Sequence, residues 1–154
     1  MQKLIIQIPC FNEGGTLAET LADLPREIEG FDRVEWLVID DGSNDDTVEV
    51  ARRGGVDHIV SLAHNQGLAK AFMAGVEASL KAGADVIVNT DGDNQYDANT
   101  IPDLVRPILT REAQIVVGER PIMQIEEFSL IKKLLQKLGS AVVRFASGTR
   151  IPDA

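Results

Sequence analysis

Five short apolar runs alternate with segments of helical spacing, and this alternation leaves the chain few possible folds. The runs are rich in valine and isoleucine and span residues 3–9, 34–40, 57–62, 85–90 and 113–118. Their length and composition predict five strands. Because the runs are almost continuously apolar, the strands are expected to form a parallel sheet that is buried on both faces.

The segments between the runs repeat apolar residues at intervals of three or four, which is typical of one face of a helix. The three stripes are Leu17, Leu21, Leu24 and Ile28; Leu68, Phe72, Val76 and Leu80; and Ile101, Leu104, Val105, Ile108 and Leu109. Thr16 with Glu19, and Ser43 with Asp46, have the spacing of capping boxes, which predicts two helix starts. The whole pattern predicts an α/β fold, a parallel sheet with helices on both faces.

Length and charge narrow the range of functions. We expect residues 1–154 to form a single domain. A formal net charge of −9 argues against a nucleic acid partner. No apolar stretch is long enough to span a bilayer and the N-terminus lacks a signal-peptide pattern, so we expect a cytoplasmic protein. Cys10 is the single cysteine, and its place at a strand end favours a packing role over a nucleophilic one.

The stretch "DGDNQYD" follows the fourth run, at the edge where parallel sheets bind ligands. It places Asp91 and Asp93 on either side of Gly92, which permits a tight turn. Hard carboxylate oxygens on a short turn suit Mg²⁺ or Mn²⁺. The alternative is an Asx turn that caps the helix expected to start near Thr100.

"IDDGSNDDT" follows the second run and carries further acidic residues. Asp40 ends the apolar run, where its carboxylate could accept a hydrogen bond from a base or a ribose. Three other aspartates are better explained by structural roles near a helix N-terminus: Asp41, Asp45 and Asp46.

The remaining strand ends are less specific. "PCFNEGG" places Pro9, Asn12 and Glu13 before a helix start, although its glycines match neither the dinucleotide fingerprint nor a phosphate loop. Arg120 follows the fifth run, where it could hold a phosphate bidentately or pair with Glu119.

Five stretches together resemble the family 2 glycosyltransferases, in particular the branch of dolichyl-phosphate and polyprenyl-phosphate sugar synthases. They are "IPCFNE", "VIDDGSNDDT", "HNQGLAKAFMAG", "NTDGDNQYD" and "VVGER", in the family's order over nearly the whole chain. The resemblance implies a nucleotide-binding, Rossmann-like sheet of the GT-A type, a nucleotide-sugar donor and a divalent metal ion. It also implies inversion at the anomeric carbon and a polyprenyl or dolichyl phosphate as the lipid-phosphate acceptor.

The same resemblance assigns roles by position. The nucleoside pocket would be lined by Pro9, Asn12, Glu13 and Asp40. The metal and the donor phosphates would be surrounded by Asp91, Asp93 and Gln95, with the two aspartates catalytic through the metal. Arg120 would reach the phosphate end, and Asp97 is expected to be an acid close to the following helix.

Two features near the end of the chain bear on the acceptor. The sequence stops at "GTRIPDA", where the resemblance leads us to expect a further acceptor-side segment, so the domain would be truncated there and could be inactive. Residues 126–147 include a basic amphipathic stretch. It would suit peripheral contact with the cytoplasmic face of a membrane, and the alternative is a helix packed on the core.

Three other interpretations remain open at this stage. A phosphatase of the haloacid-dehalogenase type also has two aspartates one residue apart, but after its first strand. A receiver-type signalling domain would need an aspartate after the third strand, where this chain has "LAHNQG". The third alternative is a nucleotide-binding fragment without turnover of its own.

Overall fold

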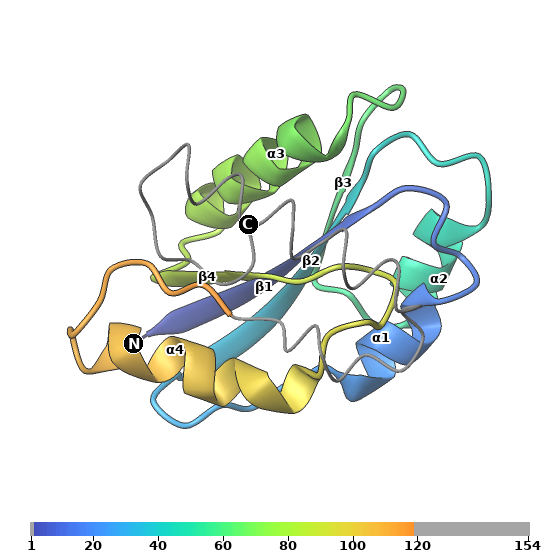
Figure 1. The fold of residues 1–154 in the computed structure, drawn as a ribbon. Helices are drawn as coiled ribbons and strands as arrows, with labels where there is room; N and C mark the ends of the chain where they lie inside the picture. The colour runs from blue at the N-terminus through green and yellow to red at the C-terminus, as the bar shows by residue number, and fades with distance from the viewer. Residues whose placement is uncertain (1, 119–154) are drawn as a thin grey trace, which may run out of the picture. The chain divides into compact units, whose positions relative to one another are not determined.

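A four-stranded parallel sheet organises the computed structural model, which describes residues 2–118 (Figure 1). The strands are β1 (Lys3–Cys10), β2 (Arg33–Asp40), β3 (His58–Ser61) and β4 (Val86–Asn89). Their order in the sheet is β3-β2-β1-β4 and all pairs are parallel. Cys10 pairs with Asp40, and Asp40 with Ser61, so three strands end level with one another. The predicted parallel sheet is confirmed, and residues up to Val116 form one compact unit.

Helices cover both faces of this sheet, as predicted. They are α1 (Leu17–Asp23), α2 (Thr47–Arg53), α3 (Leu68–Lys81), the 3-10 turn η1 (Ala98–Thr100) and α4 (Ile101–Leu109). Figure 1 shows α3 on one face and α1 and α4 on the other. Apolar side chains of α1, α2 and α4 share one core cluster, while Ala71 of α3 belongs to a second. None of the described helices combines the length and apolarity needed to cross a membrane.

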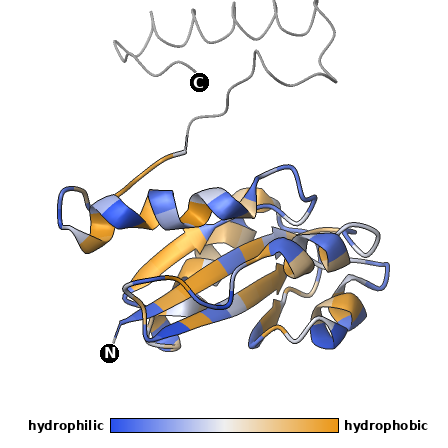
Figure 2. Cartoon of the chain, turned by 90° about the horizontal axis from the view of Figure 1, so that it is seen from below, coloured by the Kyte–Doolittle hydropathy of each residue, from blue (hydrophilic) through white to orange (hydrophobic). Residues whose placement is uncertain are grey.

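Strand β1 lies at the centre and supplies side chains to both clusters. Every residue from Leu4 to Cys10 is buried. Leu4, Ile6 and Ile8 join the cluster with α1, α2 and α4, whereas Ile5 joins the one under α3. In Figure 2 the strands are coloured mainly as hydrophobic, while the helices carry both colours. This two-sided burial explains why the run is continuously apolar rather than alternating.

Helix α3 packs through a different face from the predicted apolar stripe. The stripe of large residues is largely exposed, with Leu68 at 67% and Leu80 at 62%. The buried face consists of small residues: Ala71, Gly75 and Ser79. A Cβ at Gly75 would lie 2.5 Å from Gln7 Oε1 and 2.7 Å from Ile39 Cδ1. The helix approaches the sheet so closely that large side chains do not fit between them.

The predicted fifth strand over 113–118 is wrong in the described residues. These residues form no regular element, and Ile115 and Val117 are 83% and 85% exposed. A run of β-branched residues becomes a strand only when a neighbouring strand supplies a hydrogen-bonded ladder. Within residues 2–118, β4 pairs with β1 alone.

Neither predicted capping box forms, although the helix start predicted at Thr16 is confirmed. Thr16 is the N-cap of α1, but its side chain makes no capping bond and instead donates to Glu13 Oε2 at 2.7 Å. Helix α2 is preceded by Asp46 rather than Ser43, and Ser43 Oγ accepts from the backbone N–H of Asn12. The Ser43 hydroxyl ties two loops to one another because the loops converge at one edge of the sheet, whereas the Thr16 hydroxyl bonds within its own turn.

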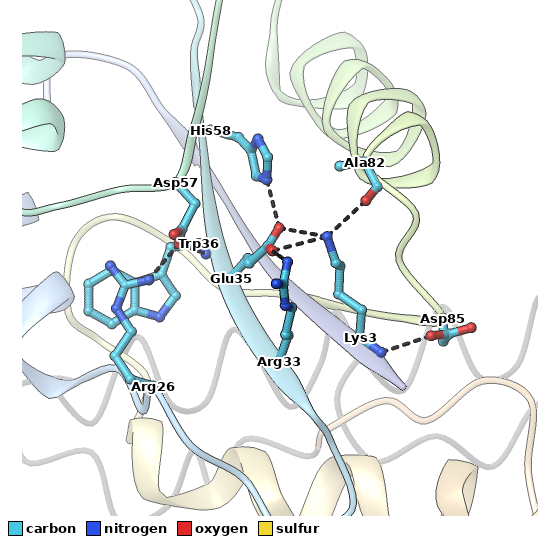
Figure 3. A network of polar contacts seen from close by, with 9 residues as sticks. All are labelled: Lys3, Arg26, Arg33, Glu35, Trp36, Asp57, His58, Ala82 and Asp85. Atoms are coloured by element: carbon cyan, nitrogen blue, oxygen red, sulfur yellow. Dashed lines mark hydrogen bonds and ion pairs between the residues drawn. The ribbon is translucent and has the colours of Figure 1, made fainter. Parts of the chain in front are cut away.

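The opposite, amino edge of the sheet carries a charged network around Glu35 (Figure 3). Lys3 Nζ lies 3.0 Å from Glu35 Oε1, and His58 Nε2 lies 2.8 Å from Oε2. Arg33 is more distant at 3.8 Å. Burial opposes ionisation of Glu35, but the hydrogen bonds from His58 and Lys3 outweigh it, so the pKa of Glu35 lies below its ordinary value.

Candidate functional site

The loops after β1 and β2 are joined by a row of hydrogen bonds at the carboxyl edge of the sheet. Glu13 N–H donates to Thr47 Oγ1 at 2.9 Å, and Gly14 N–H donates to Asp45 Oδ2 at 2.9 Å. Asn12 has a φ of 57°, and its Oδ1 accepts from the backbone N–H of Asn44. Asparagine tolerates this left-handed conformation better than most residues. The "CFNE" turn is therefore fixed against the "DGSND" loop.

Asp41 fastens the loop that precedes α3 to the same edge. Its side chain is buried, and its two carboxylate oxygens accept from the backbone N–H groups of Gln66 and Gly67, both at 2.8 Å. The structural role predicted for Asp41 is confirmed, although it serves α3 rather than α2. A buried carboxylate with two backbone donors is a strong link between distant segments.

Asp40 lies beside Asp41 in sequence, but it is the last residue of β2 and its surroundings differ. It is 5% exposed, and its Oδ1 accepts from Ser43 N–H at 2.9 Å. Pro9, on the adjacent strand, is also buried and pairs with Ile39 in the sheet. The predicted nucleoside residues Pro9, Asn12, Glu13 and Asp40 are thus brought together by the pairing of β1 with β2.

The "DGD" turn after β4 packs directly against this group. Gly92 is buried, and a Cβ there would lie 2.9 Å from Cys10 Sγ and 3.3 Å from Glu13 Cγ. Glycine is required here for close approach, whereas the left-handed residue of the turn is Asn94, with a φ of 56°. Asp91 and Asp93, on either side of Gly92, are partly buried.

The acidic stretch contains residues for both of its predicted roles, a helix-capping turn and a metal site. Asp97 caps the helical turn η1, accepting from Asn99 N–H at 2.9 Å, so its predicted helix-proximal position is confirmed. Asp93 Oδ1 accepts from Gln95 N–H at 3.1 Å, which is a local Asx-type contact. A carboxylate has about four lone-pair positions, so this contact leaves Asp93 capable of binding a cation. Gln95 is exposed on the same turn.

The edge is electrostatically negative. Burial, followed by the charges of Glu13, Asp40, Asp45 and Asp91, raises the pKa of the Cys10 thiol well above its ordinary value. Cys10 is 2% exposed and not ionised, which confirms its predicted packing role. Within residues 2–118, Glu13, Asp40 and Asp93 form no ion pair. This edge has the charge that a bound cation would neutralise.

The donor set fits Mg²⁺ or Mn²⁺ only with help from other ligands. In the described part of the chain, no cluster of three or more His, Cys, Asp or Glu side chains is placed to hold a metal. Two carboxylates on one turn nevertheless suit an ion that keeps several waters and takes its other ligands from substrate phosphates. Arg120, the predicted phosphate contact, lies outside the described residues, as does the amphipathic stretch at 126–147.

Comparison with known proteins decides the family. The model of glycosyl transferase family 2 matches residues 5–150 of the chain. The chain belongs to glycosyl transferase family 2. This confirms the resemblance carried by the five motifs, whereas the phosphatase and receiver interpretations rested on aspartate spacing alone.

Relatives in the family act on lipid phosphates according to their names. The chain is 30% identical to an undecaprenyl-phosphate mannosyltransferase of Micrococcus luteus over 98% of its own length and 63% of that protein. It is 32% identical to a dodecaprenyl-phosphate galacturonate synthase of Rhizobium johnstonii over 77% of its length and 36% of that protein. The chain therefore spans less than two thirds of these curated relatives.

The fold also matches that of a solved structure. The glucosyl-3-phosphoglycerate synthase of Mycobacterium tuberculosis superimposes with a TM-score of 0.58 and 26% identity, over 71% of this chain and 40% of that one. That structure contains Mn²⁺, uridine diphosphate and glucosyl-3-phosphoglycerate. The parallel sheet of the family 2 chain described above is thus the GT-A fold that the motifs implied.

Sequence reasoning missed Thr20, the threonine that holds the "DGD" turn. Thr20 Oγ1 donates to the Gly92 carbonyl, 72 positions further along the chain, at 2.9 Å. Thr20 lies between Leu17 and Leu21 on the buried side of α1. A threonine on an otherwise apolar helix face must find a hydrogen-bond partner when it is buried. This was the local sequence signal that could have indicated the bond from Thr20.

Proposed function

We propose that this chain transfers a sugar from a nucleotide-sugar donor to a polyprenyl phosphate, with inversion at the anomeric carbon and with Mg²⁺ or Mn²⁺ bound at the "DGD" turn. The observation that carries the proposal is the contact of Gly92 with Cys10 and Glu13. This contact supports the proposal because the turn that carries Asp91 and Asp93 packs against the loop that follows β1, in a chain of glycosyl transferase family 2.

Two groups of residues would bind different parts of the nucleotide-sugar donor. Pro9, Asn12, Glu13 and Asp40, on adjacent strand ends, would bind the nucleoside. Asp91, Asp93 and Gln95 would hold the divalent ion and the two donor phosphates, and Arg120 would add a positive charge at the phosphate end. A divalent ion held by these residues would supply positive charge that stabilises the leaving nucleoside diphosphate.

The reaction is a single displacement at the anomeric carbon. An oxygen of the acceptor phosphate forms a bond to that carbon as the bond from the carbon to the β-phosphate oxygen of the donor breaks. The nucleoside diphosphate leaves with the bonding electron pair. Because a phosphate monoester is already ionised near neutral pH, the attacking oxygen needs no strong general base, and none is assigned.

The acceptor class comes from the relatives. The names of the Micrococcus and Rhizobium enzymes specify undecaprenyl and dodecaprenyl phosphates, which are membrane lipids. The proposal therefore places the reaction at a membrane surface, on its cytoplasmic face. The structural neighbour supports a different acceptor, since its complex contains glucosyl-3-phosphoglycerate, the product of a small acidic acceptor.

A transfer assay tests the proposal and separates these acceptors. The chain is incubated with a panel of radiolabelled nucleotide-sugars, Mn²⁺ and either polyprenyl phosphate or 3-phosphoglycerate. The expected result is label in the lipid fraction that disappears in the Asp91→Asn/Asp93→Asn variant. If only phosphoglycerate is labelled, the acceptor is a small phosphorylated acid and not a polyprenyl phosphate. If no labelled product forms with any donor, the proposal that this chain transfers a sugar is contradicted.

A further inference from the structure

Thr20 donates its only hydroxyl hydrogen to the carbonyl of Gly92. The side chain is 3% exposed, so water does not compete for it. Its Oγ1 lies 2.9 Å from the Gly92 oxygen and 3.4 Å from the carbonyl oxygen of Thr16. A hydroxyl has a single hydrogen to donate, and the shorter contact has the geometry of a normal hydrogen bond.

The same reasoning separates Thr16 from Thr20. Thr16 Oγ1 lies 2.7 Å from Glu13 Oε2 and 3.1 Å from the Gly92 oxygen, and both of these atoms are acceptors. Its one hydrogen goes to the carboxylate, since a charged acceptor at a shorter distance forms the stronger bond. Thr16 therefore orients Glu13, and Thr20 is the donor on which the Gly92 carbonyl depends.

We propose that Thr20 is a positioning residue for the metal site. The inference rests on the proposed function, in which Asp91 and Asp93 hold the divalent ion. Gly92 lies between these two ligands, and its backbone is fixed by the packing of Cys10 and Glu13 and by the Thr20 hydroxyl. The hydroxyl sets where the peptide between the two carboxylates lies before any ion binds.

Such preorganisation has a measurable consequence. A group that orients metal ligands from behind changes metal affinity when it is removed, although it touches neither the metal nor the substrate. A group that merely stabilises the fold lowers the melting temperature and leaves the affinity of the folded protein unchanged. Local exchange at the turn and Mn²⁺ affinity therefore distinguish positioning from general stabilisation.

The experiment compares Thr20→Val, which keeps the side-chain shape but removes the donor, with Thr20→Ser, which restores a donor. Thr110→Val is the matched control, because Thr110 Oγ1 also donates to a backbone carbonyl, that of Arg106, at the end of α4. Amide hydrogen exchange across residues 91–97 is measured in metal-free protein. Mn²⁺ is then titrated into each protein in the presence of uridine diphosphate, which supplies the phosphate ligands, and the protein-bound ion is followed by its electron paramagnetic resonance signal.

For Thr20→Val we expect exchange at residues 91–97 to rise about fivefold, the factor for one lost hydrogen bond. Mn²⁺ affinity should fall about tenfold. Thr20→Ser should recover both, and Thr110→Val should change neither. Unchanged exchange in Thr20→Val would overturn the inference. A wild-type chain that binds no Mn²⁺ would contradict the proposed function, and the exchange data alone would then decide whether Thr20 fixes the turn.

Discussion

Asp40 and Asp41 are neighbours in sequence, yet their carboxylates perform different tasks. Asp41 uses both oxygens to hold the backbone before α3. Asp40 uses one oxygen to hold Ser43 and lies at the junction of the loops that follow β1 and β2. Its place beside Cys10 at the end of β1, rather than its charge alone, makes it a candidate for contact with the nucleoside.

Asp40→Ala should weaken nucleoside diphosphate binding whether or not Mn²⁺ is present, because Asp40 is assigned to the nucleoside and not to the metal. The expected loss is about 1–3 kcal/mol, the value of a hydrogen bond to a charged group. Calorimetric titration with and without Mn²⁺ measures it. The control is Asp46→Ala, since Asp46 is on the same loop and is exposed in an ion pair with Arg53. A loss confined to the Mn²⁺ titration would remove Asp40 from the nucleoside pocket.

Helix α3 shows why an apolar pattern does not identify the buried face. Its large residues and its small residues form two separate apolar surfaces, and the small one packs on the sheet. The choice depends on how closely the helix approaches Gln7 and Ile39, which belong to other elements.

Gly75→Val should lower the free energy of unfolding by about 1–3 kcal/mol, because the added atoms would meet Gln7 and Ile39 in a filled space. Leu80→Gln, on the exposed side of the same helix, should change it by less than about 0.5 kcal/mol. Urea denaturation of both variants provides the comparison. A larger loss from Leu80→Gln than from Gly75→Val would show that α3 packs through its large residues.

The charged network around Glu35, at the amino ends of β1, β2 and β3, should make the stability of the folded protein depend on pH. Glu35 has a pKa below its ordinary value of 4.5, so its contribution to stability is complete above that value and is lost as the pH falls through its lower pKa in the folded state. Glu35→Gln should therefore cost about 1–2 kcal/mol at pH 7, and less at an acidic pH that protonates the carboxyl group in the folded protein. Thermal unfolding of both proteins across this range tests it. A cost that is the same at both pH values would exclude the ionised carboxylate as its source.

The elements that the sequence predicted well are those determined by local composition. The four apolar runs that became strands are rich in valine, isoleucine and leucine, and the two central strands, β1 and β2, are buried over most of their length. The run at 113–118 has the same composition but gains no ladder within the described residues, and the ladder depends on a partner elsewhere. For the same reason the hydroxyl of Ser43 was misassigned, since its partner, the backbone N–H of Asn12, lies on another loop.

On the scale of the whole molecule, the described charges are divided between the two ends of the sheet. At the amino edge, Lys3 forms an ion pair with Glu35, and His58 lies within hydrogen-bond distance of the same carboxylate. At the carboxyl edge, Glu13, Asp40 and the "DGD" turn concentrate negative charge around a buried thiol. Because the whole chain also has a formal net charge of −9, this edge should repel a diphosphate in the absence of a cation. The central claim is therefore that a divalent ion joins the donor to the protein through Asp91 and Asp93.

Calorimetric titration of uridine diphosphate into the chain, with and without Mn²⁺, tests this claim most directly. We predict clear binding with Mn²⁺ and at least about tenfold weaker binding without it. Asp93→Asn should reduce the Mn²⁺-dependent affinity by about 1–3 kcal/mol, the value of a hydrogen bond to a charged group. Equal affinity with and without Mn²⁺, unaffected by Asp93→Asn, would contradict the account.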